Sequence, residues 1–167
     1  MTNIRRYFQL GHTCFLTHVT HGRRPILVEH FDLLWDSIES VRRNCPFDLI
    51  AWVVLPEHFH IVVTQLNHDL SSIIRRIKLS FSMNYRKRLD LPDGRVWQYR
   101  FWDHVIRNTE DLNRHIDYVH YNPVKHELVT DPLAYAFSSL HNFREEGLYP
   151  GDWGVKETVA TSGDFGE

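Results

Sequence analysis

The chain has 167 residues, of which 19 are Lys or Arg, 21 are Asp or Glu, and 43% are hydrophobic. A chain of this length buries roughly 70% of the surface that it exposes when unfolded, so packing alone can stabilise one domain. Two cysteines, Cys14 and Cys45, are too few for a disulfide framework and favour a reducing compartment. No apolar run reaches the ~18 residues of a membrane span, and MTNIRRYFQLGH lacks the apolar stretch of a signal peptide. We therefore expect a cytoplasmic protein with no membrane partner.

The first 150 residues contain no internal repeat and no linker rich in Pro, Gly or Ser. We expect one domain over residues 1–154. Residues 155–167 (VKETVATSGDFGE) are acidic and have no apolar face, which predicts a flexible tail after that domain.

The first half of the chain predicts a strand, a helix and a hairpin. Residues 13–20 (TCFLTHVT) are β-branched and aromatic, and the HGRRP that follows supplies turn residues. Over residues 28–43, apolar side chains recur at three- and four-residue steps, which is the period of an amphipathic helix. Two apolar runs, residues 48–55 and 58–65, flank Pro56 and Glu57 and predict a hairpin.

The second half predicts two more helices around a short strand or extended loop. A helix with a basic surface is expected over residues 70–89, and aromatic and β-branched residues dominate 96–106 (VWQYRFWDHVI). Asn108 or Thr109 can cap a third helix, which we expect to end near Pro123. This order predicts an α+β fold of the ferredoxin-like, split βαβ type, an antiparallel sheet with helices on one face and the active site on the other.

Charge is spread unevenly along the chain. The formal net charge is −2 at pH 7, yet residues 71–107 hold 9 basic and 3 acidic side chains. This local excess suits a polyanion site, because phosphate binding depends on the basic patch and not on the global charge. A solvated basic helix face explains the same pattern equally well.

Two histidines share one face of the strand predicted at 58–65. Because side chains alternate along a strand, His58 and His60 lie together, opposite Phe59, Ile61 and Val63. If the apolar set faces the helices, both imidazoles lie on the open side of the sheet, where they can bind one divalent ion. A His-x-His pair alone is not specific, since solvent-facing or hydrogen-bonded histidines are more common.

The third helix carries a second set of polar side chains. His115 and Asn122 each lie within about 60° of Tyr118 around the helix axis. Taken alone, Tyr118 is explained as an interfacial tyrosine with a partly buried ring, and Asn122 before Pro123 is explained as a residue that ends a helix.

Three segments together, LPEHFH, WQYRFWDHVIRN and HIDYVHYNPVKHELV, give the chain a resemblance to the HUH single-tyrosine transposases, and most of all to their REP-associated branch in bacteria. The likeness runs from about Arg5 to Trp153. It implies that His58 and His60 bind a divalent metal, Mg²⁺ or Mn²⁺, and that Asn122 completes the metal site. It also implies that Tyr118 is the nucleophile. Many relatives have glycine where this chain has Glu127, which puts a local turn in doubt.

The resemblance implies a DNA transposase that binds single-stranded palindromic (REP-type) hairpin DNA. Such an enzyme cleaves and rejoins one strand through a 5′-phosphotyrosine intermediate and uses no nucleotide cofactor. Consistently, the chain has no GxxxxGK[ST] phosphate loop. We expect a monomer rather than a homodimer, associated with the nucleoid. At 100° per residue, Tyr121 is turned about 100° from Asn122, so we expect Tyr118 and not Tyr121 to react.

With this resemblance, DNA is the expected partner of the basic segment at residues 71–107. Its cations could neutralise DNA phosphates, its aromatic side chains could stack on unpaired bases, and two arginines near the N-terminus could act as an arm. The DNA-binding candidates are Arg5, Arg6, Arg75, Arg76, Lys78, Arg86, Lys87, Arg88, Arg100, Trp102 and Arg107.

Two other functions remain open from the sequence. One is a domesticated protein that binds hairpin DNA without mobilisation activity. The other is a metal-dependent phosphodiesterase in which water attacks the phosphate and Tyr118 is structural.

Overall fold

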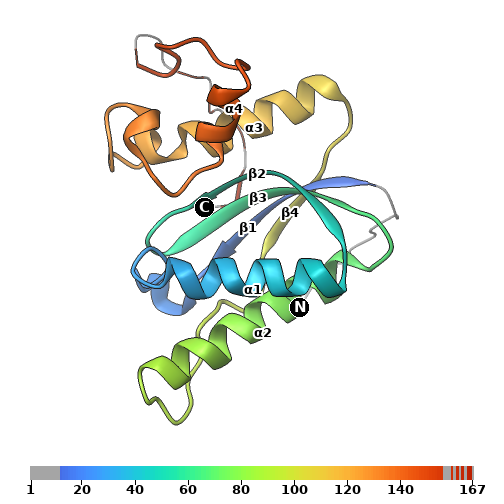
Figure 1. Cartoon of the computed structure of the whole chain (residues 1–167), viewed down its shortest axis with the longest axis vertical. Coiled ribbons are helices and arrows are strands. Elements are labelled where there is room, and N and C mark those ends of the chain that lie inside the picture. Colours follow the sequence, from blue (N-terminus) through green and yellow to red (C-terminus); the bar gives the residue numbers. More distant parts are fainter. Residues whose placement is uncertain (1–11, 156–158, 160, 162, 164, 167) are drawn as a thin grey trace.

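A four-stranded antiparallel sheet forms the centre of the computed structural model, which describes residues 12–155 and residues 159, 161, 163, 165 and 166 (Figure 1). The strand order is β2-β3-β1-β4, with every neighbouring pair antiparallel. The strands are β1 (Thr13–Val19), β2 (Phe47–Val54), β3 (His58–Gln65) and β4 (Trp102–Val105). The helices are α1 (Phe31–Asn44), α2 (Leu70–Arg88), α3 (Thr109–Lys125) and α4 (Leu140–Glu145), with short 3₁₀ turns at His21–Arg23 and Pro132–Ala134.

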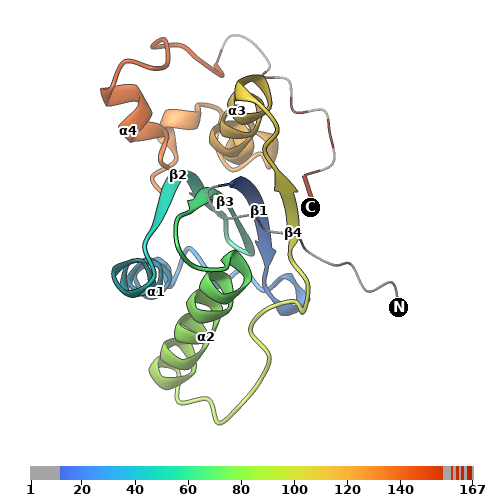
Figure 2. The same ribbon diagram turned by 90° about the vertical axis from the view of Figure 1, so that its right-hand side faces the viewer.

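Helices cover both faces of this sheet. Helices α1 and α2 lie on one face, and α3 and α4 lie over the other (Figures 1 and 2). The α+β class and the antiparallel sheet are as expected, but the expectation that all helices share one face is wrong. Strand β3 shows why, because seven of its eight residues are buried and a strand buried on both faces needs a layer on each side.

Two apolar clusters fill the spaces on either side of the sheet. Phe59 and Ile61 of β3 belong to the cluster with α1 and α2, as the alternation of the strand predicts. On the opposite face, Phe15, Val62 and Val119 belong to the cluster with α3. The site therefore lies between the sheet and α3, and not on an open sheet surface.

The predicted elements all form, with two differences at helix ends. Helix α1 begins at Phe31, three residues later than expected, after a turn. Helix α3 begins as predicted, because the Asn108 side chain accepts a hydrogen bond from the Asp111 amide at 2.9 Å. It does not end at Pro123 but continues to Lys125. A proline costs a helix one backbone hydrogen bond, and the burial of Pro123 offsets that loss.

The C-terminal end of α3 is closed by a turn that usually contains glycine. The amide of Leu128 donates to the Pro123 carbonyl and the amide of Glu127 donates to the Val124 carbonyl, both at 2.9 Å, which is the Schellman pattern. Glu127 has a φ of +57° in this turn. The position where relatives were expected to have glycine thus has a left-handed backbone conformation, and the turn forms here with a glutamate.

No helix in the described part of the chain is long and apolar enough to cross a membrane.

Candidate active site

Strand β3 brings the two predicted histidines together under α3. The His58 and His60 rings lie 4.9 Å apart, and neither side chain is exposed to solvent. Because the pair lies on the face opposite Phe59, both rings point into the layer between the sheet and α3. The juxtaposition that alternation predicted is present.

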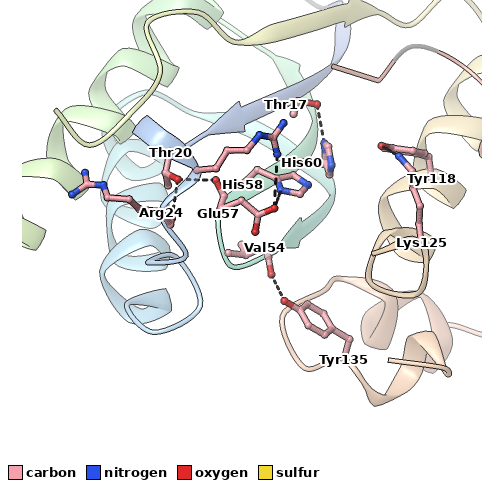
Figure 3. Close-up of polar contacts among 11 residues, drawn as sticks. Thr17, Thr20, Arg24, Val54, Glu57, His58, His60, Tyr118, Lys125 and Tyr135 are labelled. Atoms are coloured by element: carbon pink, nitrogen blue, oxygen red, sulfur yellow. Dashed lines mark hydrogen bonds and ion pairs between the residues drawn. The ribbon is translucent and has the colours of Figure 1, made fainter. Parts of the chain in front are cut away.

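Neighbouring side chains orient both imidazoles. Thr17 lies directly opposite His60 in the sheet, and its hydroxyl is 2.8 Å from the Nδ1 atom of His60 (Figure 3). The same hydroxyl donates its hydrogen to the Phe165 carbonyl at 2.7 Å, so it accepts from His60. The Nδ1 atom of His58 lies 3.2 Å from the Glu57 carboxylate, which can only accept when ionised. In both rings the lone pair therefore falls on Nε2.

Helix α3 places Tyr118 and Asn122 beside this pair. Both side chains are fully buried, and the Tyr118 ring lies 5.4 Å from the His60 ring in an edge-on arrangement. Tyr121 points elsewhere, since its ring packs edge-on against Trp153 at 6.3 Å. Tyr118 and Tyr121 therefore lie on the sides of α3 that their angles around the helix axis predicted.

Two residues at the end of α3 reach the same place without having been predicted. The Nζ atom of Lys125 donates to the Tyr118 hydroxyl at 3.0 Å, and the His126 ring lies 5.0 Å from the His58 ring. The helical spacing of Tyr118 and Lys125, seven residues and so nearly the same angle around the axis, could have indicated the lysine. His126 follows the last turn of α3, where periodicity no longer predicts direction.

Phe165 closes the site from the C-terminal side. Its ring stacks on Tyr118 with centroids 3.7 Å apart and planes 10° from parallel, and it is 4% exposed. Gly166 follows with a φ of +74° and leaves no space for a Cβ atom against Trp102. The sequence predicted an acidic, flexible tail over residues 155–167, and the burial of Phe165 was not foreseen. The division into a domain and a tail stays a prediction.

A separate group next to this site could hold a metal ion. Among the described residues, potential ligand atoms of His104, Asp111 and His115 lie within 4.8 Å of one another. Phe15 contacts both groups, with its ring 5.4 Å from His60 and 4.9 Å from His115. Of the three, only His115 was singled out from the sequence. His104 comes from β4, so helical periodicity could not indicate it, whereas Asp111 precedes His115 by four residues in α3 and could have been found from that spacing.

Hydrogen bonds already occupy the second group. One oxygen of Asp111 lies 2.8 Å from His104 Nε2 and accepts from the Arg107 amide at 3.0 Å. Partial burial opposes ionisation of this carboxyl, but the hydrogen bonds from His104 and Arg107 outweigh it and lower the pKa of Asp111 to about 2. Burial lowers the pKa of His115, which favours a neutral ring. The group thus ties β4 to the start of α3, and a metal there would have to replace the bond between His104 and Asp111.

The donor set at His58 and His60 fits a divalent metal better. Each imidazole has its Nδ1 atom held by an oxygen and its lone pair on Nε2, which is the usual arrangement of a metal-bound histidine. Asn122 supplies an amide within the same buried layer. The assignment of His58, His60 and Asn122 as ligands stays a prediction.

The DNA-binding candidates fall into groups with different environments. Arg5 and Arg6 lie outside the described residues. Arg88 forms an ion pair with Asp32 of α1, with one N–O distance of 2.9 Å, and this hydrogen bond lowers the pKa of Asp32 to about 2. Arg86 donates to the Gly94 carbonyl at 2.9 Å. Trp102 is half-buried against Phe15. Exposed side chains are those of Arg75, Arg76, Lys87, Arg100 and Arg107.

One part of the basic segment forms a cavity. Arg75, Lys78, Tyr99 and Phe101 line a hollow of about 210 Å³ together with Ser71 and Ile74. Tyr99 is 82% exposed and lies under the Arg95 guanidinium. By contrast, Trp97 is buried against Phe59 and Phe81, so its ring contributes to the core.

Comparison with known proteins identifies the family. The family described as "Transposase IS200 like" matches residues 11–121. A REP-associated tyrosine transposase of Escherichia coli K12 is 38% identical over 167 residues, which cover 98% of each chain. The chain belongs to the IS200-like transposase family, in its REP-associated branch. A solved structure of a REP-associated tyrosine transposase bound to a REP hairpin is 39% identical and gives a TM-score of 0.87 over 100% of this chain and 98% of that one.

Membership confirms the resemblance and the α+β fold expected from the sequence. This transposase is an enzyme of the tyrosine class. Two of the sequence segments that resemble the family, HFH and HYNPVKH, contact each other in the layer between β3 and α3.

Proposed function

We propose that this transposase binds single-stranded palindromic (REP-type) hairpin DNA and cleaves and rejoins one strand beside it through a 5′-phosphotyrosine at Tyr118. One observation carries the proposal: the Tyr118 ring lies 5.4 Å from the ring of His60, which with His58 is expected to bind the metal. A similar protein of known structure is bound to a REP hairpin, which supports the choice of substrate. We propose that the enzyme acts in the cytoplasm, associated with the nucleoid.

The chemistry suits these residue types. A Mg²⁺ or Mn²⁺ ion held by His58, His60 and Asn122 would polarise the scissile phosphate and offset the charge on its oxygens. Two imidazoles in the ligand set favour Mn²⁺, because Mg²⁺ prefers oxygen ligands. Tyr118 can attack phosphorus and can leave again as a phenolate, so the covalent step is reversible and needs no nucleotide cofactor.

The DNA interface that we propose includes the face of α2 around the cavity. Arg75 and Lys78 would contact phosphates, and the exposed Tyr99 ring would stack on an unpaired base. A monomer is sufficient for the reaction, since His58, His60 and Tyr118 of one chain already lie together.

The decisive test is a covalent adduct. A REP-type hairpin with a single-stranded flank is labelled at the 3′ end of the fragment that would carry the 5′-phosphate, and is incubated with protein and Mn²⁺. We expect a labelled band that survives denaturation and whose modified peptide contains Tyr118. Tyr118→Phe should lose the band and Tyr121→Phe should keep it. Cleavage without an adduct would mean that water attacks.

One observation favours a second candidate. Phe165 covers Tyr118, as it would in a protein that binds hairpins but does not mobilise them. Hairpin binding without cleavage by the wild-type chain, with either metal, would support this second function over the first.

A further inference from the structure

We propose that Lys125 is a positioning residue for the nucleophile: its ammonium group holds the Tyr118 oxygen and stabilises the phenolate in both cleavage and rejoining. This inference rests on the proposed function, in which Tyr118 is the nucleophile. It goes beyond the metal ligands and the tyrosine, because it gives a role to a residue at the C-terminal end of α3.

The contact is specific in its geometry. The Nζ atom of Lys125 lies 3.0 Å from the Tyr118 hydroxyl and donates to it. The same Nζ atom is 4.9 Å from the centre of the Tyr118 ring. A cation over the ring and against its oxygen fixes both the position of the phenol and the direction of its lone pairs.

The fold produces this contact by continuing α3 beyond Pro123. Tyr118 and Lys125 are separated by seven residues, which is 700° or nearly two full turns, so both side chains leave the same face of the helix. A helix that ended at Pro123 would not direct Lys125 back along that face. The Schellman turn at Glu127 and Leu128 fixes the last turn on which Lys125 lies.

The environment differs at the two ends of the pair. Tyr118 is fully buried between the sheet, Phe15 and Phe165, whereas Lys125 is an exposed residue. An ammonium group that reaches from solvent to a buried oxygen meets less screening at that oxygen than a surface pair does. A charged donor at 3.0 Å therefore stabilises negative charge that develops on this oxygen when it attacks or leaves phosphorus.

The covalent step needs no proton from Lys125. The phenolic proton passes to solvent, the Tyr118 oxygen bonds phosphorus, and the bond from phosphorus to the 3′-oxygen breaks. That oxygen takes a proton from solvent and becomes the 3′-hydroxyl. In rejoining, the 3′-oxygen attacks phosphorus and the phenolate leaves. Lys125 donates to the Tyr118 oxygen in both directions, so its loss slows both.

The test separates the rate of the reaction from DNA binding. We expect Lys125→Met to lower the single-turnover cleavage rate at saturating hairpin DNA by about 10-fold, near the lower end for a hydrogen bond to a charged group because the lysine is partly exposed. Hairpin affinity and its salt dependence should stay at the wild-type values. Rejoining, measured from the isolated adduct and a strand with a free 3′-hydroxyl, should slow by a similar factor. Arg43→Met on α1 is the matched control and should change neither rate.

A second variant protects the test against misfolding. Lys125→Cys treated with 2-bromoethylamine regains an ammonium at nearly the same distance, and Cys14 and Cys45 are both buried. Restored cleavage after alkylation, confirmed by mass, supports the proposal. A wild-type rate for Lys125→Met overturns it, as does failure of the alkylated protein to recover. Weaker hairpin binding with a wild-type rate at saturation would instead make Lys125 a DNA contact. A wild-type chain that forms no adduct would contradict the proposed function itself, whatever Lys125 does.

Discussion

The Thr17 hydroxyl joins three parts of the chain at one atom. It accepts from His60 Nδ1 at 2.8 Å and donates to the Phe165 carbonyl at 2.7 Å. Because a ring nitrogen that donates leaves the lone pair on the other nitrogen, Thr17 selects the tautomer of His60 that can bind a metal. The residue is not part of any motif in the sequence, and only the cross-strand register of β1 and β3 places it there.

Replacing Thr17 with valine keeps its shape and removes the acceptor. We expect Thr17→Val to weaken Mn²⁺ binding about 10- to 100-fold, the range for loss of a partner behind a metal-bound histidine. Titration of the protein with Mn²⁺, followed by electron paramagnetic resonance, measures this change. Thr13→Val is the matched control, since Thr13 pairs with Thr64 in the same two strands at 2.7 Å and touches neither histidine. Equal affinities in the two variants would remove Thr17 from the metal site.

Glu127 is a residue in a conformation that favours glycine. Its φ of +57° costs a side-chain-bearing residue about 1–2 kcal/mol, and glycine avoids this cost but loses about 0.5–1 kcal/mol through the entropy of the unfolded chain. We expect Glu127→Gly to raise the free energy of unfolding by about 0.5–1 kcal/mol, measured by urea denaturation. Glu127→Ala should give no gain, because alanine has the same left-handed strain. A gain in the alanine variant would place the cause in the glutamate charge.

At the scale of elements, α3 is the component that the sequence described least well. The period of its apolar residues and the Asn108 cap predicted its start, and the angles between Tyr118, Tyr121 and Asn122 predicted which tyrosine faces the histidines. Proline statistics predicted its end wrongly, because they do not include the tertiary contacts that bury Pro123. Lys125 was missed for the same reason.

The layer assignment failed for a related physical reason. The hairpin pattern and the alternation of His58 to Val63 predicted the sheet and one of its faces correctly. Alternation cannot say what covers the second face, and the buried Phe15 and Val62 on that side belong to apolar runs that fit one covered face or two. The aromatic side chain of Phe165 lay in an otherwise polar segment, so periodicity gave no sign of its position.

Phe165 covers the tyrosine that we propose as the nucleophile. Because Tyr118 is fully buried and the Phe165 ring stacks on it at 3.7 Å, we expect a phosphate to reach the Tyr118 oxygen only in states where that ring has moved. We expect Phe165→Ala to increase the single-turnover cleavage rate several-fold, in proportion to the larger fraction of accessible states. Val155→Ala, at a residue that is 51% exposed, is the control and should leave the rate unchanged. Slower cleavage by Phe165→Ala would mean that the ring positions Tyr118 instead of covering it.

At the scale of the molecule, the proposed active-site residues and the basic helix α2 lie on opposite faces of the sheet. His58 and His60 lie on the face of β3 opposite Phe59, beside Tyr118 of α3. The basic helix α2 lies on the other face of the sheet (Figures 1 and 2). A bound hairpin with a flank that reaches the site would therefore extend around the sheet edge formed by β4, which lies between α2 and α3 in the chain. Of the basic residues in α2, Arg88 is already paired with Asp32, so the exposed Arg75 beside the cavity is the better candidate for a phosphate contact.

Salt dependence tests this arrangement, because each neutralised phosphate of a single strand contributes a slope of about −0.7 to the plot of log affinity against log salt concentration. We expect Arg75→Gln to weaken hairpin binding and to flatten the slope by about one such increment. Arg43→Gln removes the same charge from α1, which carries none of the proposed phosphate contacts, and should leave the slope at the wild-type value. Fluorescence anisotropy of a labelled hairpin at several salt concentrations measures both slopes. An equal reduction by the two variants would show that binding responds only to the total charge of the molecule, and a change confined to Arg43→Gln would move the DNA site onto α1.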